Sequence, residues 1–194
     1  MTVDESFKYY IEKGVLPILK AEGFKKSGLH FTRRHGATLQ RVSIQKSHGN
    51  QHDHLRFYTN VIIGFDKIYA HQAKDIPSGK GSFLPHFSNR IESIVTAPAY
   101  VDIDSRTDVH ALADTQIKVI EDLCRVLDNI EGVEGLIQPT GVSPRADLMA
   151  TAYYVLGQDV AAREWLEKYS ELLKDRKNTS FADLVERLNL PRLI

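Results

Sequence analysis

Three runs of alternating apolar and polar residues, joined by short polar links, constrain the fold of this chain more than any other feature. They cover Leu29 to Arg34, Thr38 to Ser47 and His54 to Phe65. Successive side chains of a strand point to opposite faces of a sheet, so the alternation predicts strands with one buried and one wet face. Because the links are too short for crossover helices, the runs predict an antiparallel meander.

Helical patterns flank the meander. The N-terminal segment predicts a helix that begins near Asp4 or Ser6, and Pro17 predicts a kink or break in it. The segment from Asn89 to Val95 predicts a fourth strand, and Ala99 to Ile103 predicts a short fifth. A long amphipathic helix, capped by Ser105 or Thr107 and closed by Gly132, should cover the sheet with the apolar stripe Ala113, Ile117, Ile120, Cys124 and Leu127.

The pattern of residues changes after Gly132. A Pro- and Gly-containing stretch leads to three helical patterns, Arg145 to Leu156, Asp159 to Lys174 and Ser180 to Leu188. We therefore expect an α+β domain over residues 1–132 and a helical C-terminal extension over residues 133–194. The fold class is α+β: an antiparallel meander of four to five strands packed on the N-terminal helix and the long helix.

Composition excludes several classes of protein. The single cysteine, Cys124, excludes an intrachain disulfide framework and a Cys-rich zinc site. The N-terminus has no apolar secretory core, and no apolar run approaches the roughly 18 residues of a membrane span, so we expect a cytoplasmic protein with no membrane partner. The formal net charge is zero, although residues 1–50 hold nine Lys or Arg against four Asp or Glu. A dedicated nucleic-acid domain usually carries a clear basic excess.

Five features carry a family resemblance: LKAEGFKKSGLHFTRR from Leu19, IQKS from Ile44, FYTNVIIGF from Phe57, the arginine and hydrophobic pair Arg90-Ile91, and AYVDI from Ala99. In their order and spacing, the chain from about residue 16 to 130 resembles a bacterial family called domain of unknown function 4304. Tyr100 and Val101 stand where the family usually has two aromatic residues. The resemblance implies a fold, and it implies no established activity, substrate or catalytic residue.

The polar face of the predicted meander is the leading candidate site. The strand alternation places His30 and Ser43 on this face, together with three arginines. An arginine fork on such a face can bind a carboxylate or a phosphate in a bidentate manner. A merely solvated outer face is the alternative, although two amides, which are poor strand formers, argue against it. The candidate binding residues are Arg34, Arg41, Gln45, Ser47, Arg56, Tyr58 and Asn60.

Three histidines, His48, His52 and His54, lie within seven residues. Imidazoles bind zinc, nickel or copper, but no helical frame such as H-E-x-x-H holds these side chains. We therefore expect a mobile polar loop over His48 to Asp53 that binds no metal.

Signals of catalysis are weak. The chain has no Gly-x-Ser-x-Gly elbow, no complete phosphate-binding loop and no dinucleotide fingerprint, and Cys124 lies on an apolar stripe. Asp102 and Asp104 are expected to be solvated or to cap the next helix. We assign no catalytic residue, no metal and no cofactor.

These observations favour a binding module that recognises a macromolecular partner, foremost a protein, through the polar face. One form of this hypothesis, by analogy with small bacterial α+β proteins, is an immunity protein that neutralises a toxin. The second hypothesis is a nucleic-acid or phosphate binder that uses Arg34, Arg41 and Arg56, and the third is an uncatalogued hydrolase.

Overall fold

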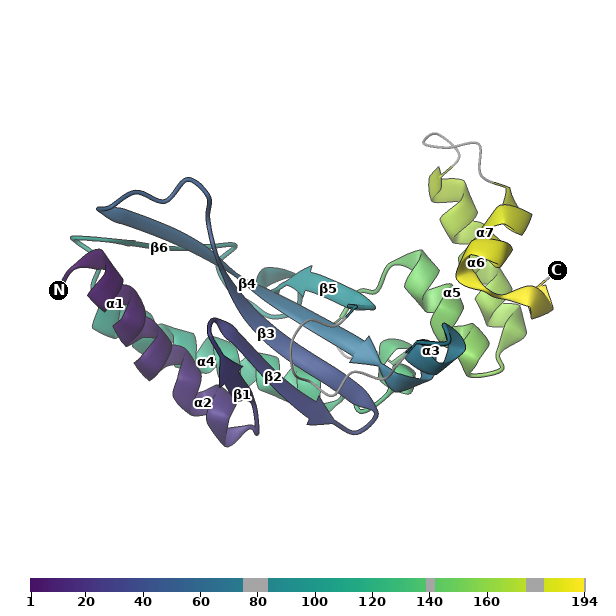
Figure 1. Cartoon of the computed structure of the whole chain (residues 1–194), viewed down its shortest axis with the longest axis horizontal. Helices are drawn as coiled ribbons and strands as arrows, with labels where there is room; N and C mark the ends of the chain where they lie inside the picture. The colour runs from purple at the N-terminus through teal and green to yellow at the C-terminus, as the bar shows by residue number, and fades with distance from the viewer. Residues whose placement is uncertain (75–83, 139–141, 174–179, 194) are drawn as a thin grey trace.

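The computed structural model describes residues 1–74, 84–138, 142–173 and 180–193. Within these ranges the protein is an α+β fold in which one antiparallel sheet carries helices on one face and at one end (Figure 1). The described strands are β1 (Lys25–Ser27), β2 (His30–His35), β3 (Thr38–Lys46), β4 (His54–Phe65), β5 (Phe87–Arg90) and β6 (Val101–Asp104). The α-helices are α1 (Val3–Tyr10), α2 (Leu16–Ala21), α3 (Asp66–His71), α4 (Val109–Asp128), α5 (Ala146–Val155), α6 (Asp159–Leu173) and α7 (Phe181–Leu188).

The sheet is built around β4. Its order is β1-β2-β3-β4-β5, and β6 also pairs with β4. One edge of β4 is shared, because β6 pairs with its first residues, 54–57, and β5 pairs with residues 60–63. The predicted antiparallel meander is thus confirmed. The predicted strand from Asn89 to Val95 is only partly correct, because β5 starts two residues earlier and ends where the 3-10 turn Ile91–Ser93 begins.

The N-terminal helix changes its winding in front of Pro17. Thr2 caps α1 through a capping box with Glu5, two residues before the expected start. The segment Ile11–Val15 is a π-helical turn, and α2 follows it with Pro17 in its first turn. Proline has no amide N–H and crowds the preceding turn, and a wider turn accommodates this without a break. In that turn Gly14 lies so close to α4 that an added Cβ would stand 2.9 Å from the Ala113 carbonyl oxygen.

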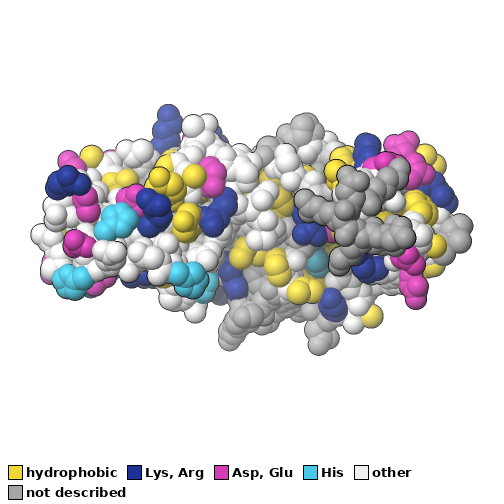
Figure 2. All heavy atoms as spheres, turned by 90° about the horizontal axis from the view of Figure 1, so that it is seen from above, with side chains coloured by type: hydrophobic (Ala, Val, Ile, Leu, Met, Phe, Trp, Pro, Cys, Tyr) yellow, Lys and Arg dark blue, Asp and Glu magenta, His cyan; other side chains and the backbone are white. Residues whose placement is uncertain are grey.

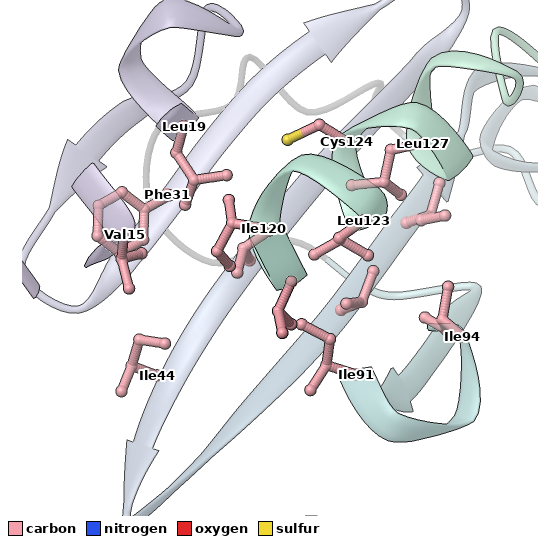
Figure 3. Close-up of a cluster of buried hydrophobic side chains, with 14 of the residues drawn as sticks. Val15, Leu19, Phe31, Ile44, Ile91, Ile94, Ile120, Leu123, Cys124 and Leu127 are labelled. Carbon is pink, nitrogen blue, oxygen red and sulfur yellow. The ribbon is translucent and has the colours of Figure 1, made fainter. Parts of the chain in front are cut away.

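The long helix α4 covers the inner face of the sheet, as expected. Its N-cap is Asp108, whose carboxylate accepts from two backbone N–H groups, rather than Ser105 or Thr107. Ile120 is fully buried, whereas Ile117 is only half-buried. The buried stripe is therefore rotated from the predicted one. Figure 3 shows the resulting core, in which α4 side chains meet those of the N-terminal helix and the strands; the labelled residues are Val15, Leu19, Phe31, Ile44, Ile91, Ile94, Ile120, Leu123, Cys124 and Leu127.

The three C-terminal helices gather at the end of the molecule where β4 runs into α3 (Figure 1). They enclose a second, smaller hydrophobic cluster that includes Leu166 and Leu184. Helix α5 contributes to both clusters, because Met149 packs in the main core while Tyr154 packs in the smaller one. The division at residues 132 and 133 stays a prediction. No described helix combines the length and apolarity that a membrane span needs.

Candidate binding face

We call the sheet surface opposite the α4 side the outer face. The burial of β4 alternates residue by residue along its first ten positions, so every second side chain points outward. Strand register then brings together residues that are far apart in the sequence. The described outer-face side chains include Lys25, His30, Thr32, Arg34, Arg41, Ser43, Gln45, Arg56, Tyr58, Asn60, Arg90 and Asp102.

A polar row crosses four strands of this face. His30 lies opposite Ser43, Ser43 opposite Asn60, and Asn60 opposite Arg90. The His30 Nδ1 atom and the Ser43 hydroxyl are 2.7 Å apart, within hydrogen-bonding distance. Facing side chains of neighbouring strands are about 5 Å apart, so this row forms one continuous polar surface.

Next to the row, two arginines and two tyrosines stack in what we call the Arg–Tyr ladder. The Arg90 guanidinium carbon lies 3.8 Å from the centre of the Tyr58 ring, and that of Arg56 lies 3.9 Å from the centre of the Tyr100 ring. The two tyrosine rings meet edge to face, with centroids 6.4 Å apart. Tyr100 is 44% exposed, so the ladder is built at the surface and is not part of the core. Cation–π contacts of this geometry fix the orientation of otherwise flexible side chains.

A carboxylate anchors one end of the ladder. Arg56 donates from Nε and from one terminal nitrogen to the two oxygens of Asp102, both at 2.8 Å. This bidentate hydrogen bond holds the pKa of Arg56 above its usual range and that of Asp102 below it. His54 Nε2 lies 3.3 Å from the same carboxylate. The position of Asp102 in the sequence suggested a solvated side chain or a helix cap. The structure instead makes Asp102 the partner of Arg56, a predicted site residue.

The two amides of the face are paired. Asn60 Nδ2 donates to Gln45 Oε1 at 3.0 Å, across neighbouring strands. In the described part of the chain, the Gln45 amino group and the Asn60 carbonyl oxygen form no other hydrogen bond. The pair consequently presents one donor group and one acceptor, which is the pattern that a peptide group or another amide complements.

The structure does not bring every predicted residue to the ladder. Arg34 lies toward the other end of β2, where it donates to both oxygens of the Asp66 carboxylate. Arg41 donates to the Thr32 hydroxyl at 3.0 Å, and partial burial lowers its pKa. Ser47 lies just past the end of β3, where its backbone N–H donates to the Arg56 carbonyl oxygen.

Hydrogen bonds join the histidine-containing link between β3 and β4 to the start of β4, and the mobility expected for His48 to Asp53 stays a prediction. Asn50 accepts from the backbone N–H of Arg56 and donates to its carbonyl oxygen, and Gln51 forms an isolated bridge with His54. Since His54 belongs to β4, the three histidines do not share one loop. Within the described residues, no group of three or more His, Cys, Asp or Glu side chains is placed to hold a metal ion.

Figure 2 shows the molecule from above, turned by 90° from the view of Figure 1. In the half that contains β6 and the start of β4, basic side chains lie directly beside hydrophobic and histidine side chains, with acidic side chains interspersed.

A family model described as "Domain of unknown function (DUF4304)" matches residues 15–168. This chain belongs to that family. The match reaches well beyond residue 130, where the sequence resemblance was expected to end, and takes in α5 and part of α6. Searches among curated proteins and among solved structures give no match. The DUF4304 assignment names no activity, so the function has to be argued from the outer face.

Two residues that sequence reasoning missed form a buried polar network in this DUF4304 domain. Arg33 and Gln40 point to the inner face, where Arg33 Nε donates to Gln40 Oε1 at 2.9 Å and a terminal nitrogen donates to Asp128 at 2.6 Å. Gln40 Nε2 donates to the carbonyl oxygens of Leu127 and Ile130 at the end of α4. The network ties two strands to the C-terminus of α4, which is a structural role.

Other parts of the domain offer less chemistry. A cavity of about 670 Å³ opens beside Gly36 at the turn between β2 and β3. Two of its lining acids, Asp128 and Glu134, are paired with Arg33 and Lys67, and the third, Glu131, lies 3.7 Å from His35 Nε2. Burial raises the pKa of the Cys124 thiol to about 12, so this cysteine is not a thiolate nucleophile at neutral pH.

Proposed function

We propose that this protein is a binding module of the bacterial cytoplasm that recognises a macromolecular partner, in the first place another protein, through the outer face of its sheet. The observation that carries the proposal is the Arg–Tyr ladder. Tyrosine and arginine dominate the residues that contribute most to binding energy at protein interfaces. Here two of each are held in one surface cluster by stacking and by the Asp102 carboxylate.

Preorganisation strengthens this proposal. A flexible arginine or tyrosine loses rotamer freedom when it binds, at about 0.5–1.5 kcal/mol for each side chain. The four ladder side chains already lie in one arrangement, because each ring carries a guanidinium at under 4 Å. A folded core does not need such a cluster, since the apolar side of β4 packs independently against α1 and α4. The ladder is therefore available for binding.

The test compares two tyrosine variants. Tyr100→Ala removes an exposed rung of the ladder, and Tyr169→Ala removes a tyrosine of α6 that also contacts an arginine, Arg187, but lies away from the sheet. Tagged wild-type protein captures the partner from native cells, and titration then measures its affinity. We expect Tyr100→Ala to weaken binding about tenfold or more, with little change in melting temperature, and Tyr169→Ala to bind as the wild type does.

Replacing Arg41 and Arg56 together with serine is a second test of the same surface. Both arginines are only half-buried, and ion pairs and hydrogen bonds at such partly exposed positions add little to stability. The double variant should therefore fold and should bind the partner less tightly. Undiminished binding by both this variant and Tyr100→Ala would refute the role of the outer face. Capture of RNA with salt-sensitive affinity would favour the nucleic-acid hypothesis instead, and capture of a toxin would specify an immunity role.

A further inference from the structure

The charges of the outer face are unevenly matched. Three described acids lie at this face, and each pairs with an arginine: Asp66 with Arg34, Asp102 with Arg56, and Asp104 with Arg106. By contrast, neither Lys25 nor Arg90 has a carboxylate partner among the described residues. The face therefore carries a cationic excess that a partner with acidic groups would neutralise.

Arg90 is the best placed of these cations. Its guanidinium carbon lies over the Tyr58 ring, 3.8 Å from the ring centre, and this contact immobilises the group. The N–H edges of a guanidinium stacked in this way stay available, and they match the two oxygens of a carboxylate. In the described part of the chain Arg90 forms no side-chain hydrogen bond or ion pair that would occupy those donors.

The amide pair lies beside this guanidinium. Asn60 is the cross-strand neighbour of Arg90, and Gln45 is bonded to Asn60 on the far side. A carboxylate held by Arg90 would bring its own peptide backbone over the free donor and acceptor of this pair. From these contacts we infer that Arg90, together with Gln45 and Asn60, is a subsite for an acidic side chain of a protein partner. This inference rests on the proposed function of the outer face.

Nucleic acid fits the same residues less well. Bases bind open sheets mainly by stacking on exposed aromatic faces. Here an arginine already covers one face of each tyrosine, Arg90 on Tyr58 and Arg56 on Tyr100. Strong phosphate binding also needs several uncompensated cations, and Arg34 and Arg56 are each neutralised by a bidentate aspartate.

The probe for this subsite is a hexaglutamate peptide, added to isotope-labelled full-length protein and followed by NMR. The side-chain N–H signals of Gln45, Asn60 and Arg90 report directly on the subsite. We expect saturable shifts of these signals that shrink with added salt, are absent with hexaglutamine, and disappear in Arg90→Gln. Arg106→Gln, which removes an exposed arginine from the end of β6, is the matched control and should leave the shifts intact.

Several outcomes would overturn the inference. Shifts that spread evenly over surface lysines, or that persist in Arg90→Gln, would show that the peptide binds by general charge only. Larger shifts of the same signals with hexauridylate at equal concentration would assign the subsite to nucleic acid. With the captured partner, a loss of affinity in Tyr100→Ala but none in Arg90→Gln would refute this subsite alone, whereas a loss in neither would refute the proposed function as well.

Discussion

Replacing the polar residue Gln40 with methionine should strongly destabilise the protein. Gln40 is fully buried on the inner face of β3. Its amino group donates to the Leu127 and Ile130 carbonyl oxygens at 2.9 and 3.0 Å, and its oxygen accepts from Arg33 at 2.9 Å. Methionine has nearly the same length and volume, so Gln40→Met removes these hydrogen bonds while leaving only a small cavity.

The size of the loss follows from the bonds removed. A hydrogen bond between neutral groups contributes about 1 kcal/mol to stability, and one to a charged group contributes about 1.5–3 kcal/mol. Two bonds of the first kind and one of the second give a loss of about 3.5–5 kcal/mol. Arg33 keeps its bonds to Asp128 and to the Glu22 carbonyl oxygen, so its charge is not left without a partner. Since domains of this kind are typically stable by about 5–15 kcal/mol, the loss should be easy to detect.

The assay is urea unfolding followed by circular dichroism, with Gln45→Met as the control. Gln45 is the same residue type on the same strand, but it is exposed on the outer face, so its replacement should change the free energy of unfolding by no more than about 0.5 kcal/mol. If Gln40→Met and Gln45→Met unfold at the same urea concentration, the buried network does not hold the sheet to α4.

Three further predictions concern stability. Ile120→Asp should lower the free energy of unfolding by several kcal/mol, because it buries an unpaired charge in a fully enclosed site. Ile117→Asp, at a half-buried site, should lower it far less, and equal losses would contradict the observed helix face. Gly14→Ala should lower the melting temperature although alanine favours helices, since its Cβ would stand 2.9 Å from the Ala113 carbonyl oxygen, and an increase would show that the contact yields easily. Burial lowers the pKa of His86 to about 4. The pKa of His86 in the unfolded chain is about 6.5, so its contribution to the free energy of unfolding is fully present above pH 6.5 and is lost as the pH falls toward 4. The difference in free energy of unfolding between wild type and His86→Gln should therefore shrink as the pH falls over this range. A constant difference would exclude the effect.

Alternation along β2, β3 and β4 could be read from the sequence because one face of each strand is mostly apolar. The same reasoning could not find Arg33 and Gln40. They are polar residues on the inner face. Gln40 donates to two carbonyl oxygens at the end of α4, and Arg33 donates to the Asp128 carboxylate, so both depend on a helix end about ninety residues later in the chain. Local patterns carry no information about which backbone groups a distant helix end leaves without a donor.

The candidate site shows the same limit. Tyr58 and Arg56 were predicted on the outer face because they belong to the regular alternation of β4. Arg90, Tyr100 and Asp102 were not assigned to it, because β5 and β6 reach β4 through pairings that sequence periodicity does not specify. The rotation of the buried stripe on α4, which leaves Ile117 half-buried, likewise depends on how the helix rolls against the sheet.

The shared edge of β4 has a consequence for how such a protein can diverge. Half of the Arg–Tyr ladder comes from β4 itself. The other half comes from the end of β5 and from the residue just before β6, two separate segments that both pair with β4. The residues that point inward from β4 are enclosed in the core, while their outward neighbours make few demands on it. Under the proposed function, substitutions in these two short segments would change what the outer face binds and leave the inward-facing residues of β4 in place, so one scaffold would serve different partners.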